Sequence, residues 1–584
     1  MPSRFPALAC FALAFTTSAF AQATQISVTN AAADAVLKGN YNPADYQAAT
    51  EIGNIAVIAP DMAARISKDT LAATLTKLAT YYNRNTGTDT VSGTQGIGAA
   101  RRWVYSRFQA YGAQYGGRLL PSYLQFTQAI CGMNGHKDVF AVLPGRDTSN
   151  HGVLIVEGHL DSRCENNCDI TCKAQGADDD GSGVALVLEL ARVLPKYTFN
   201  RTLVFLVTTA EEQGLYGAYA FRDYCVNAKI PVTAVQNNDV VGGIICGPTA
   251  SPPGCTTPGA LDSTHVRIFS TAINFSMNKS LARFIKGQYE QWLKPSAAVP
   301  MTINIMDPTD RTGRGGDHEP FSEVVEPVIP ALRFTESFEN GNGSPPPAGR
   351  QHSTLDVIGD DLNNDGNIDQ YYVNYDYLVR NTQINGIGLI GGALGPQPPA
   401  FTLTEPQPQR YILATLTAPT SPVDQYKAAV RVTGNDFAVV YAMNGTTFTL
   451  PDTKAGTTYY VATASVDGNG AQSLYTQEQS ITASVNGPPP TAIAPREATG
   501  GPGLRDVRIA ADRITWILEA GNRIGTTAAL RIVDAQGRTL RLHTFRFAGP
   551  RYEATLGRDR LPSGAYRAVL EMGGKTVSSR PLVL

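Results

Sequence analysis

The sequence is poor in charge and in long apolar runs, and each shortage excludes a class of protein. Charged residues make up 17% of its 584 positions, and 48 basic against 50 acidic side chains leave a formal net charge of −2. A chain so near neutrality does not bind nucleic acid or anionic membranes over its whole surface. No apolar stretch reaches the roughly 20 residues that a membrane-spanning helix needs. We therefore expect neither a nucleic-acid partner nor a membrane span.

What the sequence does contain is enough apolar material for several folded domains. Hydrophobic residues account for 43% of the chain, with 25 Tyr and 21 Phe, which excludes a mostly disordered or collagen-like protein. At the usual domain size, the length allows roughly three to five domains.

The N-terminus has the pattern of an export signal. Arg4 precedes an apolar run over residues 7–15, and Ala19-Phe20-Ala21 places small residues where a signal peptidase cleaves. The alternative, a membrane anchor, is disfavoured because the run is too short. Residues 1–21 are therefore predicted to be a signal peptide, and the mature protein to be secreted, either extracellular or periplasmic.

Cysteine is scarce, and seven cysteines remain after cleavage. They are Cys131, Cys164, Cys168, Cys172, Cys225, Cys246 and Cys255. Outside the cytosol cysteines usually form disulfides, and an odd number allows three pairs at most. Cys246 and Cys255 are the favoured local pair. The evenly spaced trio over residues 164–172 has a second interpretation, a thiolate metal site, but no matching Cys or His pair follows at zinc-finger spacing, which favours disulfides.

Hydrophobic periodicity divides the first 395 residues into two parts. Residues 22–68 have weak periodicity and are expected to form a leader or wrapping segment. Beyond them strands and helices alternate, with helices predicted over 71–82, 99–110 and 183–194 and strands over 139–143, 153–156 and 202–207. Alternation with continuous apolar strands predicts an α/β catalytic domain, residues 69–395, with an open, largely parallel mixed sheet flanked by helices. Ligands of such sheets bind beyond the carboxyl ends of the strands.

Two all-β sandwich modules are predicted after a Pro-rich joint at residues 396–400. In the first, residues 396–486, short strands are expected at 428–432, 437–441 and 459–466. Its stretch from Tyr459 to Gly470 resembles the closing strands of a fibronectin type III domain.

The second module, residues 487–584, has strand-like runs at 529–533, 540–547 and 565–570. From residue 491 onward, 14 Arg and one Lys face eight acidic residues, a net charge of +7. The arginines either solvate a small sandwich or bind a surface or export partner.

Acidic residues gather at the predicted carboxyl ends of strands. His159 and Asp161 follow one strand, Glu211 and Glu212 follow the next, and three adjacent acids at 178–180 precede an apolar helix. Asp239 comes after another apolar approach. Capping of the helix accounts for one of these acids. The others are like charges at one sheet edge, and they repel each other unless a divalent cation neutralises them.

Six motifs in chain order make this region similar to the secreted di-zinc aminopeptidases of the bacterial leucyl aminopeptidase type. The motifs are Gly158-His159-Leu160-Asp161-Ser162, GADDDGSG at 176–183, AEEQGLYG at 210–217, Asn238-Asp239, DHEPF at 317–321 and QHSTLD at 351–356. The resemblance spans about residues 70–395.

The resemblance implies a site with two zinc ions and a peptide substrate. Its metal ligands would be the bridging Asp179, His159 and Asp239 on one zinc, and Glu212 and His352 on the other. Glu211 would be the general base, and Asp161 would fix the tautomer of His159 from behind. The family also implies a cis peptide bond after Asp179.

Two features near the motifs have open interpretations. His318 either lines the cleft and hydrogen-bonds the reacting carbonyl, or is structural. A loop at 311–316 carries Arg311 and Arg314 where some relatives have a disulfide, which favours an acidic or carboxylate-bearing substrate.

A loop after His352 resembles the start of a calcium loop. Its oxygen ligands would be Asp361, Asn363, Asp365, Asn367 and Asp369, with Gly366 at the sixth position. Because Tyr372 replaces the usual Glu at position twelve, an Asx-rich turn is the competing interpretation. Calcium, if bound, would be structural.

Three functions from different classes follow from these residues. The first is a secreted zinc exopeptidase that uses a metal-bridged water and a Glu base. The second is a glutaminyl-peptide cyclotransferase, which looks similar around the same motifs. The third is a non-catalytic binding module, against which the intact Glu211 and the five ligand positions argue.

Overall fold

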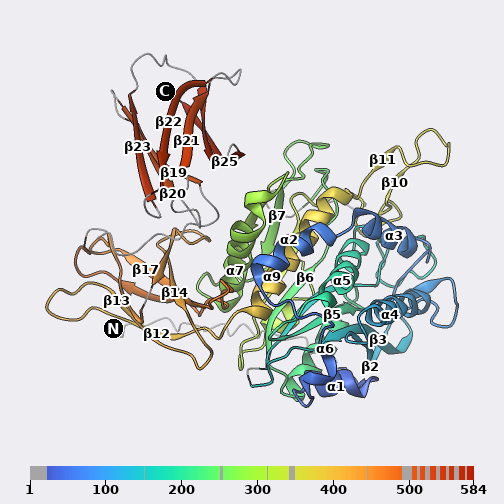
Figure 1. Ribbon diagram of the computed structural model, residues 1–584. Coiled ribbons are helices and arrows are strands. Elements are labelled where there is room, and N and C mark those ends of the chain that lie inside the picture. The colour runs from blue at the N-terminus through green and yellow to red at the C-terminus, as the bar shows by residue number, and fades with distance from the viewer. Residues whose placement is uncertain are drawn as a thin grey trace, which may run out of the picture.

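A computed structural model describes most of the chain in detail. The described residues are 23–149, 151–249, 254–311, 314–340, 349–443 and 445–488, together with the seven strands between Gly503 and Val583. The predicted signal peptide lies outside them. The described residues form an α/β part followed by two all-β parts (Figure 1).

The α/β part is built on a nine-stranded mixed sheet with the order β1-β2-β3-β5-β4-β6-β9-β7-β8. Strands β5, β4, β6 and β9 run parallel in its centre, and antiparallel strands flank them. The fold class predicted from the sequence is thus confirmed. The strands are β1 Thr24–Val28, β2 Leu120–Ile130, β3 Met133–Leu143, β4 Val153–His159, β5 Thr202–Thr208, β6 Val232–Asn238, β7 His265–Phe269, β8 Thr302–Ile305 and β9 Ala331–Glu336.

Helices cover both faces of this sheet (Figure 1). Helices α2 to α5, α7 and α9 contribute to one hydrophobic core, and α1, α6 and α8 contribute to a second core on the other face. The helices are α1 Ala31–Leu37, α2 Ile55–Arg65, α3 Lys68–Ala79, α4 Gly96–Gln114, α5 Gly181–Val193, α6 Tyr216–Asn227, α7 Met277–Trp292, α8 Glu319–Ser322 and α9 Tyr375–Leu394, with short 3-10 turns at Pro43–Tyr46, Leu194–Lys196 and Lys294–Ser296.

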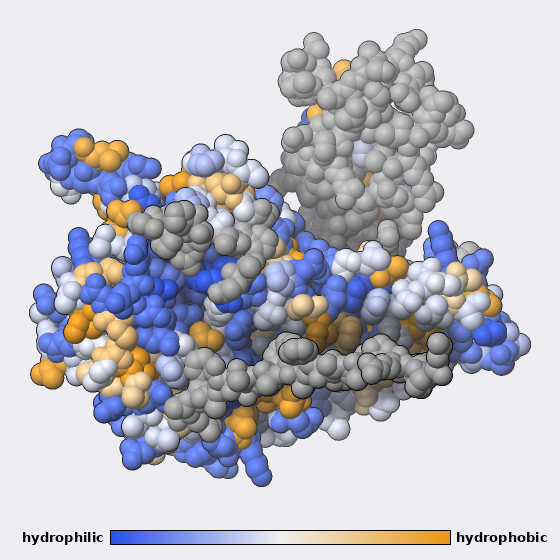
Figure 2. Space-filling model, turned by 180° about the vertical axis from the view of Figure 1, so that it is seen from behind, coloured by the Kyte–Doolittle hydropathy of each residue, from blue (hydrophilic) through white to orange (hydrophobic). Residues whose placement is uncertain are grey.

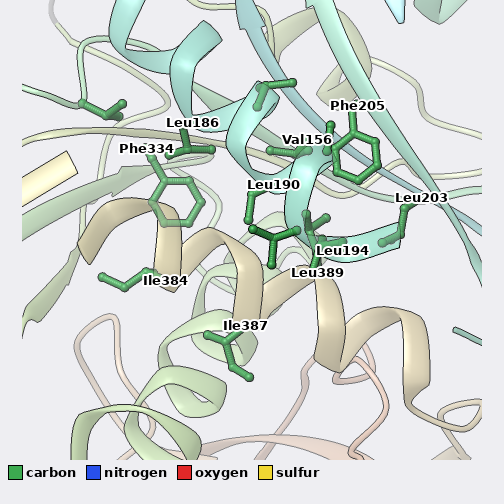
Figure 3. Packing of buried hydrophobic residues seen from close by; sticks show 14 of the residues in the cluster. Val156, Leu186, Leu190, Leu194, Leu203, Phe205, Phe334, Ile384, Ile387 and Leu389 are labelled. Atoms are coloured by element: carbon green, nitrogen blue, oxygen red, sulfur yellow. The ribbon is translucent and has the colours of Figure 1, made fainter. Parts of the chain in front are cut away.

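The larger core lies where α5 and α9 pack against the central strands. Figure 3 shows Leu186 of α5 beside Phe334 of β9, and Phe205 of β5 beside Val156 of β4, with Ile384 and Ile387 of α9 lower in the view. Glycines let α9 approach closely: a Cβ added at Gly392 would lie 2.4 Å from Leu154 Cδ2. Because protein interiors are close-packed, this contact leaves no room for a side chain at Gly392.

The segment 22–68, which was expected to be a leader or wrapping segment, contributes a strand and helices to the α/β part. Strand β1 pairs antiparallel with β2 at one edge of the sheet, and α1 and α2 bury apolar residues against the two cores. The other edge is β8, where Ile305 O accepts a hydrogen bond of 2.9 Å from Asn435 Nδ2 of the following module.

Each all-β part consists of a three-stranded and a four-stranded antiparallel sheet. The first contains β12 Ala400–Thr404, β13 Leu413–Thr417 and β16 Thr447–Thr449 opposite β14 Gln425–Arg431, β15 Val439–Met443, β17 Thr458–Val466 and β18 Gln479–Thr482. The second contains β19 Gly503–Ile509, β20 Arg513–Glu519 and β23 Arg551–Gly557 opposite β21 Thr527–Val533, β22 Thr539–Arg546, β24 Ala565–Met572 and β25 Lys575–Val583. All six strands predicted for these two regions are present.

A buried ion network joins the first β-part to the α/β part. Glu478 accepts hydrogen bonds from Arg431 Nη2 at 2.6 Å and lies 3.0 Å from Arg283 Nη1 of α7. These side chains are at most 3% exposed. A second ion pair, Lys286 with Asp436, crosses the same interface at 2.7 Å, with the carboxylate 52% exposed. The interface thus has one desolvated and one hydrated charge contact.

Six of the seven described cysteines form disulfides, as predicted. The pairs are Cys131–Cys168, Cys164–Cys172 and Cys246–Cys255, and Cys225 is a buried free thiol. The local pair and the odd thiol are confirmed. The disulfide between Cys164 and Cys172 closes the loop 164–172, and Cys168 within that loop is bound to Cys131.

The surface has no single dominant apolar area on the face seen in Figure 2. Hydrophilic residues cover most of the coloured atoms, and hydrophobic ones form small separate patches. In the part of the chain that the structure describes, no helix combines the length and hydropathy of a membrane-spanning segment.

Candidate metal centre

The central strands bring the predicted ligands to one edge of the sheet. His159 is the last residue of β4, Glu211 and Glu212 follow β5, and Asp239 follows β6. Asp179 lies two residues before α5. Because the strands are parallel, their carboxyl ends meet at this edge.

Asp179 stands between two histidines, with one carboxylate oxygen facing each. Its Oδ1 is 3.2 Å from His159 Nε2, and its Oδ2 is 3.0 Å from His352 Nε2. Asp239 Oδ1 lies 3.6 Å from His159 Nε2, and Glu212 Oε2 lies 3.2 Å from His352 Nε2. The structure thus places the five predicted ligands in two groups of three that share Asp179.

The donor set fits zinc. Four buried atoms of the five ligands have no hydrogen-bond partner among the described residues: His159 Nε2, Asp179 Oδ2, Glu212 Oε1 and Asp239 Oδ1. Burying polar atoms without partners is costly, and a cation would satisfy these atoms. Mixed imidazole and carboxylate ligands are those that zinc takes in hydrolases.

The three adjacent acids at 178–180 have separate partners. Asp180 is the N-cap of α5, accepting from Gly183 N at 2.9 Å, and it also accepts from His159 N at 3.0 Å. Asp178 accepts from Gly242 N at 2.9 Å. Only Asp179 is left to face the histidines, and the peptide bond after it is cis, as the resemblance implied.

Asp161 is close to His159 and holds the loop that follows β5. The Nδ1 atom of His159 is 3.1 Å from the backbone carbonyl of Asp161 and 3.7 Å from its carboxylate. That carboxylate accepts from the backbone N–H groups of Glu211 and Glu212 at 3.3 and 3.2 Å. Asp161 therefore contacts His159 through its carbonyl and orients the two glutamates through its side chain.

Glu211, the predicted base, belongs to the same acidic cluster. It forms a group with His159 and Glu212 in which ligand atoms lie within 4.8 Å of one another. Burial raises the pKa of Glu211 well above its usual value; His159 opposes this rise, and the charges of Glu212 and Asp239 add to it. An acid with a raised pKa is a better proton acceptor once it is ionised.

His318 lies beside the centre without joining its two ligand groups. It is fully buried, and its Nε2 contacts Thr309 O at 3.2 Å. Burial lowers the pKa of His318. Its Nδ1 is 3.9 Å from Asp310 Oδ2, and Asp310 is itself paired with Arg333 at 2.8 Å.

Sequence reasoning did not single out two arginines that contact the ligands. Arg333 Nη2 lies 3.0 Å from Asp239 Oδ2, so that one oxygen of this carboxylate faces Arg333 and the other faces His159. Arg163 donates to Glu212 Oε2 at 2.6 Å. Arg163 follows the His159 motif directly, and its position next to a cysteine of the 164–172 trio was the available signal.

The loop with calcium-like spacing forms the turn of the hairpin between β10 Gly359–Asp360 and β11 Gln370–Tyr371. Asp361 accepts from Asp365 N at 3.2 Å and from Gly366 N at 2.8 Å, and Asp369 accepts from Leu362 N at 2.8 Å. These are Asx-type turn bonds. Among the described residues the three aspartates do not gather as a metal-ligand group. Calcium binding here stays a prediction.

Fold and site together define an α/β protein with a candidate metal centre at the carboxyl ends of its parallel strands. The model of peptidase family M28 matches residues 138–248, which include His159, Asp179, Glu211, Glu212 and Asp239. A probable zinc metalloprotease of Pyrenophora tritici-repentis is 32% identical over 298 residues, 48% of this chain and 67% of that protein. The chain belongs to the zinc metalloproteases of peptidase family M28.

Other similarities cover part of the chain. A probable zinc metalloprotease of Pyricularia oryzae is 31% identical over 330 residues, 54% of this chain and 62% of that protein. The chain thus spans about three fifths to two thirds of these relatives. Among solved structures, the LapA aminopeptidase of Legionella pneumophila has a TM-score of 0.41 at 20% identity over 58% of this chain and 76% of that one. A glutaminyl cyclase of an Acidobacteriales bacterium has a TM-score of 0.38 at 17% identity, covering 56% of this chain and 95% of that one.

Proposed function

We propose that this protein is a secreted aminopeptidase with two zinc ions that removes N-terminal residues from peptides. The observation that carries the proposal is the position of Asp179, whose two oxygens face His159 and His352 separately. A carboxylate that reaches two cations is the feature that paired metal sites in hydrolases require.

Each zinc would be held by one of the two groups that share Asp179. His159 and Asp239 complete one group, and Glu212 and His352 complete the other. When bound, zinc polarises a substrate carbonyl and lowers the pKa of a water molecule to near neutrality.

Glu211 would move the proton in this reaction. Its neighbour Glu212 faces His352, whereas Glu211 groups with His159, so the two adjacent acids serve different positions. The Glu211 carboxylate accepts a proton from the attacking water and returns it to the departing amine. The bonds from Asp161 to both backbone N–H groups keep the two side chains in their separate directions.

The free α-amino group of a substrate distinguishes exopeptidase from endopeptidase activity. A zinc ion or a nearby acid at this edge of the sheet would receive that amino group, whereas an internal peptide bond has none to offer. Secretion is supported by the export pattern over residues 1–21 and by the three disulfides, which persist in oxidising compartments.

The two C-terminal modules would bind the protein to a surface or to an export partner. The seven strands in two sheets over residues 396–486 support a fibronectin type III-like sandwich. The net charge of +7 from residue 491 onward suits a partner or surface of negative charge.

The test is hydrolysis of a panel of aminoacyl nitroanilides, with and without a zinc chelator. We expect activity that the chelator abolishes and added zinc restores. A peptide with a blocked N-terminus should stay intact, because it lacks the free α-amino group. Cleavage of the blocked peptide would remove the exopeptidase assignment, and pyroglutamate formation from a peptide with N-terminal Gln would replace it with the cyclotransferase.

A further inference from the structure

A second set of unpartnered polar atoms lines a small cavity beside the metal centre. The cavity has a volume of about 30 Å³, enough for one ion or water molecule. Two of its lining residues directly precede predicted zinc ligands: Asp178 precedes Asp179, and Gln351 precedes His352. The charged and amide residues of the lining are Asp178, Glu336, Asn340, Arg350, Gln351 and Asp356. No step of the proposed reaction uses these side chains.

Two carboxylates of this lining lie close to one common point. A Cβ atom added to Gly243 would lie within 2.7 Å of both Asp178 Oδ2 and Glu336 Oε2. Glu336 is 1% exposed, and no donor group of the described residues reaches its Oε2. Two ionised carboxylates so close together repel each other. The pair must therefore hold either a shared proton or a cation.

The side chain of Gln351 favours the cation. Gln351 lines the same cavity and is 7% exposed, and neither its Oε1 nor its Nε2 has a hydrogen-bond partner among the described residues. A second amide, that of Asn340, also lines the cavity. A shared proton needs only the two carboxylates, whereas a cation needs space and further oxygen ligands. The cavity supplies the space, and the amide carbonyls supply the ligands.

Glycine at position 243 keeps this space open. Its φ lies outside the left-handed region, so the near approach of the two carboxylates, and not the backbone conformation, requires a glycine there. Arg350 lines the cavity as well, but its guanidinium donates to Leu355 O at 2.6 Å and lies over the ring of Tyr372. Among the described residues the lining thus carries three carboxyl groups against one guanidinium, an excess of acidic groups that favours a cation.

We propose that this cavity binds a calcium ion, with Asp178, Glu336 and Gln351 as its side-chain ligands. Carboxylate and amide oxygens are the ligands that calcium takes, whereas zinc sites in proteins include nitrogen or sulfur. The ion would join the end of β9 to the segments that precede Asp179 and His352, and so hold both segments in place. The inference does not depend on the proposed function, because the five predicted zinc ligands take no part in it.

The test is equilibrium dialysis of the zinc-saturated full chain against radioactive calcium. Wild type is expected to bind calcium with a Kd of about 10⁻⁴–10⁻³ M, the range of extracellular calcium sites. Glu336→Gln keeps the shape of the side chain but removes its charge, and should weaken this binding by at least about tenfold. Gln351→Met removes an amide that has no partner, which folding tolerates, and should weaken calcium binding as well. Asp365→Asn makes the same charge change in the exposed loop with calcium-like spacing, and is the matched control.

Three results would overturn the inference. The first is a wild type that binds no calcium, in which case the two carboxylates share a proton. The second is loss of all calcium binding in Asp365→Asn, which would place the ion in the exposed loop. The third is calcium binding by Gln351→Met with the affinity of wild type. Circular dichroism verifies that each variant is folded, and Gln351→Met decides the matter should Glu336→Gln fail to fold.

Discussion

Glu478 offers a sharp test of what holds the first β-part against the α/β part. Replacing it with Gln keeps the shape of the side chain and leaves Arg283 and Arg431 buried without a counter-charge. Removing one partner of a buried ion pair costs about 3–5 kcal/mol. The matched control is Lys286→Ala, which breaks the hydrated pair with Asp436 across the same interface and costs at most about 1 kcal/mol.

The assay is thermal unfolding, and the size of the shift also reports cooperativity. With an unfolding entropy of about 2.1 cal/mol/K per residue, a unit of about 460 residues that unfolds together would lose about 3–5 °C. A sandwich of about 90 residues that unfolds alone would lose about 15–25 °C for the same free energy. If Glu478→Gln lowers the midpoint no more than Lys286→Ala does, the buried network does not hold the two parts together.

Three further outcomes follow from the structure. Glu211→Gln should lower kcat by at least about 10²-fold, the usual contribution of a general base, while zinc content stays as in wild type and in the exposed control Glu165→Gln; full activity of the variant would refute the base assignment. Burial lowers the pKa of Lys279 to about 8, so that the folded state is destabilised while this lysine is charged, and Lys279→Met should raise the thermal midpoint at pH 7. The gain should shrink as pH rises from about 8 toward 10.5, where the lysine is neutral in both the folded and the unfolded state. A gain that is independent of pH would contradict the burial of a charged lysine. Deleting residues 22–30 removes β1 and should lower the midpoint in a thermal melt, because Thr24–Val28 pairs with β2; an unchanged midpoint would show that the strand is dispensable.

The alternating α/β pattern was predictable because the central strands are buried on both faces. The runs at 153–156 and 202–207 are continuously apolar and extend in the structure to β4 Val153–His159 and β5 Thr202–Thr208. Helix α9 gave no such signal. It contains several glycines, which disfavour helix in isolation, and their role appears only where Gly388 meets Ile285 of α7 with 3.0 Å left for a Cβ.

The candidate site was predictable for the ligands that follow strands and much less so for the rest. His159, Glu212 and Asp239 come directly after apolar strands, so topology alone brings them together. His352 sits on a loop with a positive φ of 57° and was assigned only through the family resemblance. Arg163 was missed because it contacts Glu212 and His352, which lie 49 and 189 positions away in the sequence, and no local pattern indicates such distant contacts.

The two outermost strands of the nine-stranded sheet, β1 and β8, are among its shortest. An unpaired outer strand is a template on which another molecule adds by backbone hydrogen bonds, the first step of aggregation. At one end the five-residue β1 covers the eleven-residue β2, and at the other the four-residue β8 receives a hydrogen bond from Asn435 of the first β-part. The N-terminal segment thus replaces a long outer strand by a short one, which offers a second molecule little backbone to pair with.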